Sequence, residues 1–300
     1  MKRIPLKRIL GVFIIIIFFY FIIKSLYENW YNLKEAKLRF EIYYLLLSYI
    51  MMFITFILVA FTWKKNLQML NENISLITAI KINAISVLPK YAPGKVWGII
   101  GKVYLAKKEG ISEHSSVITI SLETILYLLS GIILFLVTSL SIIKSNFTYL
   151  YYLLIIPICL IAIYPPILIR ITNFFLKLFK RPTIDIMPHY YQILILLLLY
   201  MLSWILQGIG VFFLISSFYS IPFKSILIIS GLHAFSWVVG FLSIIAPAGL
   251  GVKEGIFSYF LSYILPVGIA AISSLLVRIW GTIGELLYFL IFSTKLKKYL

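Results

Sequence analysis

The sequence predicts an all-α polytopic membrane protein with about six full spans and two broken or re-entrant helical hairpins, or eight spans when each hairpin counts as one. Hydrophobic residues make up 62% of the 300 residues and charged residues only 12%, whereas soluble domains carry about 25% charged residues. Several apolar runs approach the length of about 20 residues that crosses a bilayer. Two others are short and interrupted by proline and glycine. This composition excludes a soluble enzyme, a nucleic-acid-binding module and a disordered protein.

The N-terminal region, residues 1–73, is expected to contribute two spans. A basic start precedes an apolar run at residues 9–23. Bulky and charged residues follow this run in place of a small-residue cleavage site, so we expect an uncleaved span and not a signal peptide. The second span covers residues 42–62 and is closed by Trp63, Lys64 and Lys65.

Residues 74–143 are expected to form the first broken-helix unit. The apolar stretch at residues 74–88 is too short and too polar for a full span. Pro89, Pro93 and Gly94 follow it and are expected to end the helix. A second short amphipathic helix is predicted at residues 97–109. One half-helix in and one half-helix out make a re-entrant hairpin, and a full span at residues 116–143 completes the unit.

The second half of the chain is expected to follow the same plan. Residues 144–224 hold two central spans, at 149–169 and 192–217, and a basic loop containing Arg170 and Lys177 lies between them. Residues 225–300 hold the second broken-helix unit. Its apolar stretch at 225–245 leads into a proline- and glycine-rich break, half a span follows at 256–265, and the last span covers 269–292.

The basic excess predicts the orientation in the membrane. Lysine and arginine outnumber acidic residues by 27 to 10, which gives a net charge of +17. In a membrane protein such an excess marks the cytoplasmic loops. Far more basic residues fall in the loops that are inside when the N-terminus is inside, so both termini are expected to be cytoplasmic. We expect a multi-pass protein of the plasma or inner membrane. The count of basic residues does not distinguish a re-entrant hairpin from two tilted spans, because both return the chain to the same side of the membrane.

The two breaks resemble each other. The first reads APGKV at residues 92–96, with Glu123 later in a span, and the second reads APAGLGVK at residues 246–253, with Glu285 later in a span. In the predicted topology the two hairpins enter from opposite sides, as in an inverted repeat, which in transporters places a site near the midplane. Chance recurrence in a biased composition is the alternative.

Charged residues within spans are the candidate site, because a charge at the centre of a span costs about 2.5–3.5 kcal/mol. We expect a cavity for a lipid headgroup, in which basic side chains attract an anionic group and acidic ones balance them or carry a proton. Ion pairs that hold helices together are the alternative reading. The substrate-binding candidates are Lys95, Lys102, Glu123, Lys253, Glu254, Arg278 and Glu285. The residues expected to shape the backbone are Pro93, Gly94, Pro247, Gly249 and Gly251.

Three further residues carry structural expectations. Gly281 and Gly284 on the last span are expected to allow close helix approach. His233 stands alone among apolar residues, so we expect a hydrogen-bonded packing residue and not a ligand. The three histidines are scattered and Asp185 is the single aspartate. We therefore expect no catalytic residue, no bound metal and no cofactor.

At these motifs the chain resembles the lysylphosphatidylglycerol synthase transmembrane region, also called a flippase-like domain. The matching residues are KYAPGKVW at 90–97, Gly101, Lys102, Ala106, Gly110, Glu123, PAGLGVKEG at 247–255 and Arg278. The family more often has arginine at the place of Lys253. The resemblance covers nearly the whole chain. It implies a polytopic plasma-membrane protein that moves a phospholipid or lipid-linked glycan between leaflets.

Three functions compete on this sequence. A lipid translocase explains the broken helices and the charges at membrane depth. A non-transporting membrane partner or anchor of a glycosyltransferase or lipid-modifying synthase is the alternative. An integral enzyme is disfavoured, because neither paired acidic residues nor an HExxH or GxSxG pattern occurs. The chain ends directly after the last span, so we expect a stand-alone family member without the soluble aminoacyl-transfer domain. The expected partners are anionic or lipid-linked membrane lipids and no nucleic acid.

Overall fold

The structure is a computed structural model, and it describes residues 39–87, 97–139, 157, 161, 164–178, 183, 188–243, 249 and 251–293. Every regular element in these residues is a helix, and five of the helices are long and apolar enough to cross a membrane. The predicted class, an all-α polytopic membrane protein, is therefore confirmed. The predicted span at residues 9–23 and most of the one at 149–169 lie outside the described residues.

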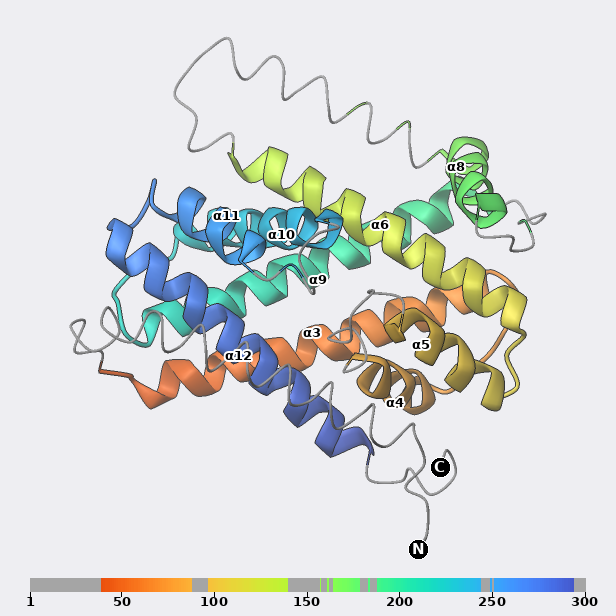
Figure 1. Cartoon of the computed structure of the whole chain (residues 1–300), viewed down its shortest axis with the longest axis horizontal. Coiled ribbons are helices and arrows are strands. Elements are labelled where there is room, and N and C mark those ends of the chain that lie inside the picture. The colour runs from red at the N-terminus through yellow and green to blue at the C-terminus, as the bar shows by residue number, and fades with distance from the viewer. Residues whose placement is uncertain are drawn as a thin grey trace, which may run out of the picture.

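The bundle contains four long helices (Figure 1): α3 (Ile42–Gln68), α6 (Glu113–Ser139), α9 (Tyr190–Ser216) and α12 (Val267–Ser293), the last of which is the most oblique to the long axis. Each has 27 residues and is about 40 Å long at 1.5 Å per residue, more than a hydrocarbon core of about 30 Å. Helices α3 and α9 are antiparallel, because the N–H of Glu41 donates to the carbonyl of Ser217 over 2.7 Å.

The last helix, α12, runs in the same general direction as α3 and crosses it obliquely (Figure 1). Its Trp280 Nε1 donates to the hydroxyl of Ser48 over 3.0 Å, and two turns later Tyr288 packs against Phe56 with ring centroids 4.6 Å apart. The hydroxyl of Tyr288 also donates to the carbonyl of Ile80 in α4 (Leu76–Val87) over 3.1 Å. Helix α12 therefore begins at the end of the bundle where α3 begins.

Helix α4 and α5 (Trp97–Lys108) form a hairpin that enters and leaves at one end of the bundle. The side-chain amide of Asn66 near the end of α3 donates to Thr119 near the start of α6, over 2.8 Å. Helix α3 ends at the same end of the bundle where α6 begins. Helices α4 and α5, which lie between them in the chain, therefore enter the bundle and return to that same end. Each has 12 residues, about 18 Å, and reaches only part of the way across. The re-entrant arrangement predicted here is therefore present, and the joining residues 88–96 lie outside the described part.

A second hairpin enters from the opposite end (Figure 1). It consists of α10 (Ser225–Leu242) and α11 (Val252–Leu261). Helix α10 follows the end of α9 after a short turn, and α11 leads into the start of α12, so both arms meet the same end of the bundle. Opposed hairpins are what an inverted repeat requires, and the repeat itself stays a prediction.

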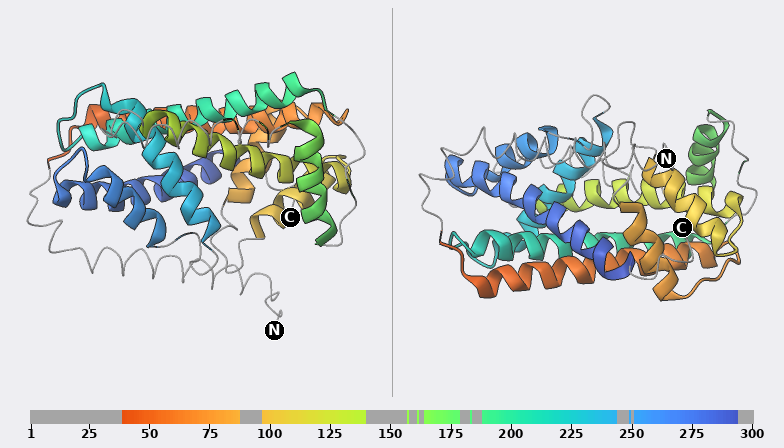
Figure 2. Two further views of the ribbon diagram at one scale, coloured as in Figure 1. Left: turned by 90° about the horizontal axis from the view of Figure 1, so that it is seen from above. Right: turned by 60° about the horizontal axis from the view of Figure 1, so that its bottom comes forward.

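Helix α8 (Pro165–Leu178) corrects one expectation. The sequence was interpreted as the tail of a span followed by a basic loop, but these residues form one 14-residue helix. Pro165 stands in its first turn, where a missing N–H is tolerated. Leu168 and Thr172 are buried one turn apart on the inner face. Both views in Figure 2 show α8 running roughly at right angles to α3 and α9, across the end of the bundle.

Small residues set the closest helix contacts. A side chain at Gly208 of α9 would overlap Ser230 of α10, and one at Gly284 of α12 would overlap Met52 of α3. The expectation for Gly281 was wrong, because a side chain there would meet nothing within 4 Å. Glycine spacing along a helix does not tell which glycine faces a neighbour.

Candidate functional site

A shielded ion pair joins the first hairpin to the bundle. Lys102 Nζ of α5 lies 2.6 Å from Glu123 Oε2 of α6, and the side chains are 8% and 15% exposed. The same Nζ lies 4.3 Å from the ring centroid of Trp63 on α3. A cation over an aromatic face is stabilised by the negative ring face. Three helices therefore surround this single charge.

Aromatic and hydroxyl groups line the bundle beside this pair. Tyr127 lies one turn beyond Glu123 on α6, stacks on Trp204 of α9 at a centroid distance of 4.2 Å, and packs edge-on to Tyr200 at 5.6 Å. Aromatic side chains from α6 and α9 therefore lie together in the interior of the bundle, one helical turn from Glu123.

A second shielded ion pair lies at the opposite hairpin. Arg278 Nη1 of α12 lies 2.6 Å from Glu254 Oε1 of α11, and the side chains are 15% and 13% exposed. The other carboxylate oxygen of Glu254 accepts the N–H of Gly251 over 2.7 Å. One carboxylate thus balances Arg278 and caps the start of α11. This cap explains why α11 begins at Val252, four residues before the predicted start.

Backbone packs directly on backbone at the tip of the second hairpin. Gly249 has φ of +70°, and an added Cβ there would lie 2.8 Å from the carbonyl oxygen of Gly240 in α10. Gly240 in turn faces the Cβ of Lys253, 3.1 Å from its own added Cβ. The two arms of the hairpin can approach this closely only because both positions lack a side chain.

This close approach gives a prediction with a matched control. Gly249→Ala is expected to destabilise the protein more than Gly251→Ala. Both glycines have positive φ, +70° and +79°, but a Cβ at Gly251 would meet no atom of the described residues within 4 Å. Gly251→Ala should therefore show only the backbone cost of about 1–2 kcal/mol. The free energy of unfolding in mixed micelles of dodecyl sulfate measures both variants, and equal losses would contradict the predicted clash.

His233 of α10 is buried, but it is not the hydrogen-bonded residue that was expected. Neither ring nitrogen has a hydrogen-bond partner in the part of the chain that the structure describes. Its ring packs instead edge-on against Trp204 at 6.2 Å and Phe257 at 5.8 Å. Aromatic contacts therefore hold this side chain between α9, α10 and α11.

The structure places four of the predicted charged residues in two ion pairs, and Lys253 and Glu285 belong to neither of them. Lys102 and Glu123 belong to the first hairpin and α6, and Glu254 and Arg278 belong to the second hairpin and α12. The predicted residues outside the described part are Pro93, Gly94, Lys95 and Pro247. Sequence analysis missed the role of Trp63, which was interpreted only as the end of a span. Nothing in the sequence reveals that α5 places a lysine over its ring.

The two pairs share one chemical capacity. In each, a cation is neutralised by a carboxylate in a site of low exposure, where charge-assisted hydrogen bonds are stronger than in water. A phosphodiester also carries one negative charge and accepts hydrogen bonds from such cations, although it is tetrahedral and the carboxylate is planar.

Comparison with known proteins covers the same region. The family model described as the lysylphosphatidylglycerol synthase TM region matches residues 8–287. This match includes both hairpins and both ion pairs. No curated protein matches the chain.

Proposed function

Because the chain belongs to the family of lysylphosphatidylglycerol synthase TM regions, we propose that it moves a phospholipid or lipid-linked glycan between the two leaflets of a cell membrane. The observation that carries this proposal is the pair of shielded ion pairs, one at each of two hairpins that enter from opposite ends. In transporters, broken helices of this kind place the site near the middle of the bilayer.

The proposed substrate contact is a phosphate that competes with a carboxylate. An uncompensated charge at membrane depth costs about 2.5–3.5 kcal/mol. Lys102 and Arg278 therefore stay paired while the protein is empty. An arriving lipid phosphate pairs with the cation and releases Glu123 or Glu254. The cation remains neutralised throughout, and the released carboxylate avoids the same cost by taking up a proton.

The proposed orientation follows from the described basic residues at the two ends of the bundle. The end that holds α8 and the first hairpin carries Lys64, Lys65, Lys107, Lys108, Arg170 and Lys177. At the other end the described residues include Arg39 and Lys224. The positive-inside rule assigns the first end to the cytoplasm. On this proposal the first hairpin opens to the cytoplasmic leaflet, the second to the outer leaflet, and both termini are cytoplasmic.

Leaflet exchange in reconstituted vesicles tests the proposal. Purified protein is placed in liposomes that contain phosphatidylglycerol with a fluorescent nitrobenzoxadiazole label, and dithionite then bleaches the label in the outer leaflet. We expect bleaching to continue into the inner-leaflet label in protein-containing liposomes only. Bleaching that stops at the outer leaflet, as in empty liposomes, would contradict exchange of this lipid. The same assay with a fluorescently labelled lipid-linked glycan tests the second proposed substrate class.

A second candidate function rests on the description of the family, which names the membrane region of a synthase. On this reading the bundle anchors a separate glycosyltransferase or lipid-modifying synthase without moving lipid. Co-purification with such an enzyme should then survive neutralisation of Arg278 or Glu285. Lipid movement by the purified protein alone would favour the first function.

A further inference from the structure

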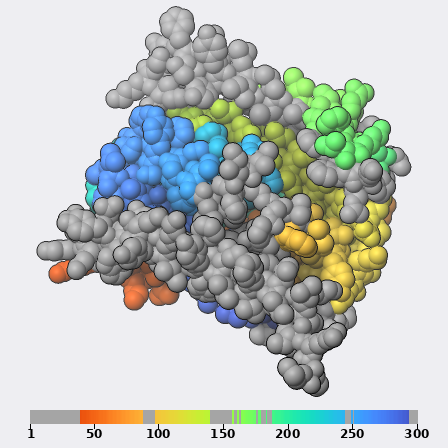
Figure 3. Space-filling model, viewed as in Figure 1, coloured from red at the N-terminus to blue at the C-terminus, as the bar shows by residue number. Residues whose placement is uncertain are grey.

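Helix α8 occupies a position that the ion pairs do not explain. It lies at the end of the bundle where α3 ends and α6 begins (Figure 1), and its surface is open to the outside (Figure 3). Because the long helices cross the membrane, a helix at right angles to them at the bundle end lies in the plane of the membrane surface (Figure 2).

The sequence of α8 divides its surface into three faces at 100° per residue. The inner face is buried against α6 and α9 through Leu168 and Ile169. The opposite face is apolar yet exposed and consists of Ile171, Phe174 and Leu178. Between these two faces lies a polar edge consisting of Arg170, Asn173 and Lys177, which recur at every third or fourth residue.

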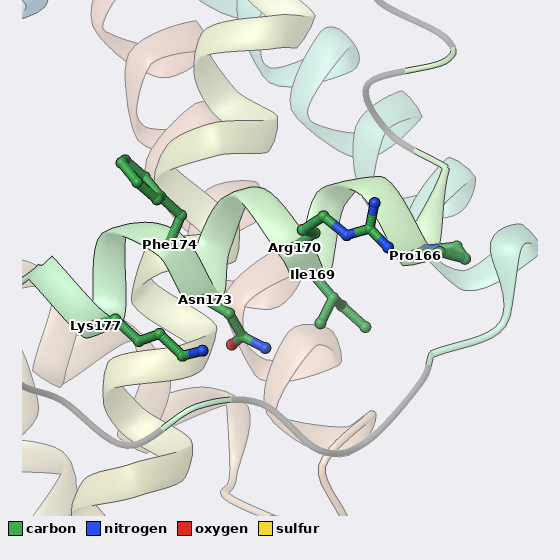
Figure 4. Close-up of a pocket in the computed structure, with 6 residues that line it drawn as sticks. All are labelled: Pro166, Ile169, Arg170, Asn173, Phe174 and Lys177. Carbon is green, nitrogen blue, oxygen red and sulfur yellow. The ribbon is translucent and has the colours of Figure 1, made fainter.

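A pocket of about 440 Å³ lies along this polar edge (Figure 4). The residues that line it are Pro166, Ile169, Arg170, Asn173, Phe174 and Lys177. Figure 4 shows Asn173 and Lys177 extending to the same side of the helix. The pocket thus combines two cations and an amide with apolar walls, at the lower end of the usual size range of ligand sites.

The exposed apolar face indicates what surrounds α8. Three large apolar side chains on the face opposite the protein would be unfavourable in water. In the interfacial region of a bilayer they lie against acyl chains, and the polar edge then faces the headgroups. Neither Arg170 nor Lys177 forms an ion pair with a carboxylate among the described residues.

We propose that the polar edge of α8 binds the phosphate of an anionic phospholipid in the leaflet at this end of the bundle. Arg170 and Lys177 contact the phosphate, and Phe174 lies along the acyl chain. The occupant is a membrane lipid and not a soluble anion, because the apolar face next to the cations needs an apolar partner. The site shares no residue with either ion pair, so it stands independently of lipid translocation.

Native mass spectrometry of the full chain in detergent, titrated with phosphatidylglycerol or phosphatidylcholine, tests this site. The double variant Arg170→Gln/Lys177→Gln is expected to weaken the tightest phosphatidylglycerol binding about thirtyfold, because each basic residue near an anionic lipid surface contributes about a factor of five. Phosphatidylcholine binding should not change by a comparable factor. Phe174→Ser should weaken both lipids to a similar extent.

The matched control is Lys64→Gln/Lys65→Gln, which removes the same charge from the same end of the bundle. It is expected to leave the tightest phosphatidylglycerol binding within about threefold of the parent, because neither lysine lines the pocket and charges further away are screened. An equal loss in both double variants would assign the binding to general surface charge and overturn the site. Unchanged binding in Arg170→Gln/Lys177→Gln would overturn it as well. All these substitutions are on the surface, so the fold should persist in each variant.

Discussion

Arg278→Ala is expected to abolish leaflet exchange and to lower the free energy of unfolding by about 3 kcal/mol. Removal of one partner from a shielded ion pair leaves the other charge uncompensated. Here the orphan is Glu254, which is 13% exposed and lies 2.6 Å from the lost guanidinium group. Glu254 also caps α11 through the N–H of Gly251, so disturbance of its carboxylate reaches the hairpin itself.

A double-variant cycle separates headgroup binding from structural pairing. Glu254→Gln keeps an oxygen for the N–H of Gly251 but removes the negative charge. In Arg278→Ala/Glu254→Gln no charge is left without a partner, so most of the lost stability should return. If Arg278 contacts the lipid phosphate, exchange stays absent in this folded double variant. Return of exchange would show that the pair is only structural. Arg278→Lys keeps the cation and should retain part of the activity.

Lys102→Ala is the second change with a large expected effect. It should lower the free energy of unfolding by about 3–4 kcal/mol, because it orphans Glu123 and removes the cation from the face of Trp63. Lys107 on the same helix offers a matched control. It lies 3.3 Å from Glu113, but the two side chains are 64% and 48% exposed. Lys107→Ala should cost less than about 1 kcal/mol, as surface pairs do.

Reversible unfolding in mixed micelles of dodecyl sulfate and a mild detergent measures both lysine variants. Glu123→Gln removes the orphan charge and should rescue part of the stability lost in Lys102→Ala. Equal losses in Lys102→Ala and Lys107→Ala would contradict the shielding of the first pair. A loss in Lys102→Ala that Glu123→Gln fails to rescue would assign the effect to packing against Trp63 alone.

The fold could be predicted from the sequence because lipid imposes long apolar helices and proline breaks them. The predicted starts of α3, α5 and α10 agree with the structure to the residue. The failure at α8 has a physical reason. Its basic residues recur with a helical period, but they were interpreted as loop charges because they lie between spans. The early start of α11 depends on a carboxylate that caps its own helix, which an apolar run does not reveal.

The candidate site was harder to predict than the fold. Helical spacing places Arg278 and Glu285 on one face of α12, but Arg278 forms its ion pair with Glu254 on a different helix. Contacts between helices depend on rotation and depth, which no spacing within one helix encodes. The same limit applies to Trp63 beneath Lys102. The free-energy cost of a charge within the bilayer indicates which residues need a partner. Only the three-dimensional packing of the helices identifies that partner.

One consequence concerns α12, which contacts both hairpins. Arg278 pairs with α11, and Tyr288 donates to the backbone of α4, about 15 Å further along the same helix. On the proposed function, α12 would couple the two hairpins. A rotation of this helix that separated Arg278 from Glu254 would also move Tyr288 away from the backbone of Ile80.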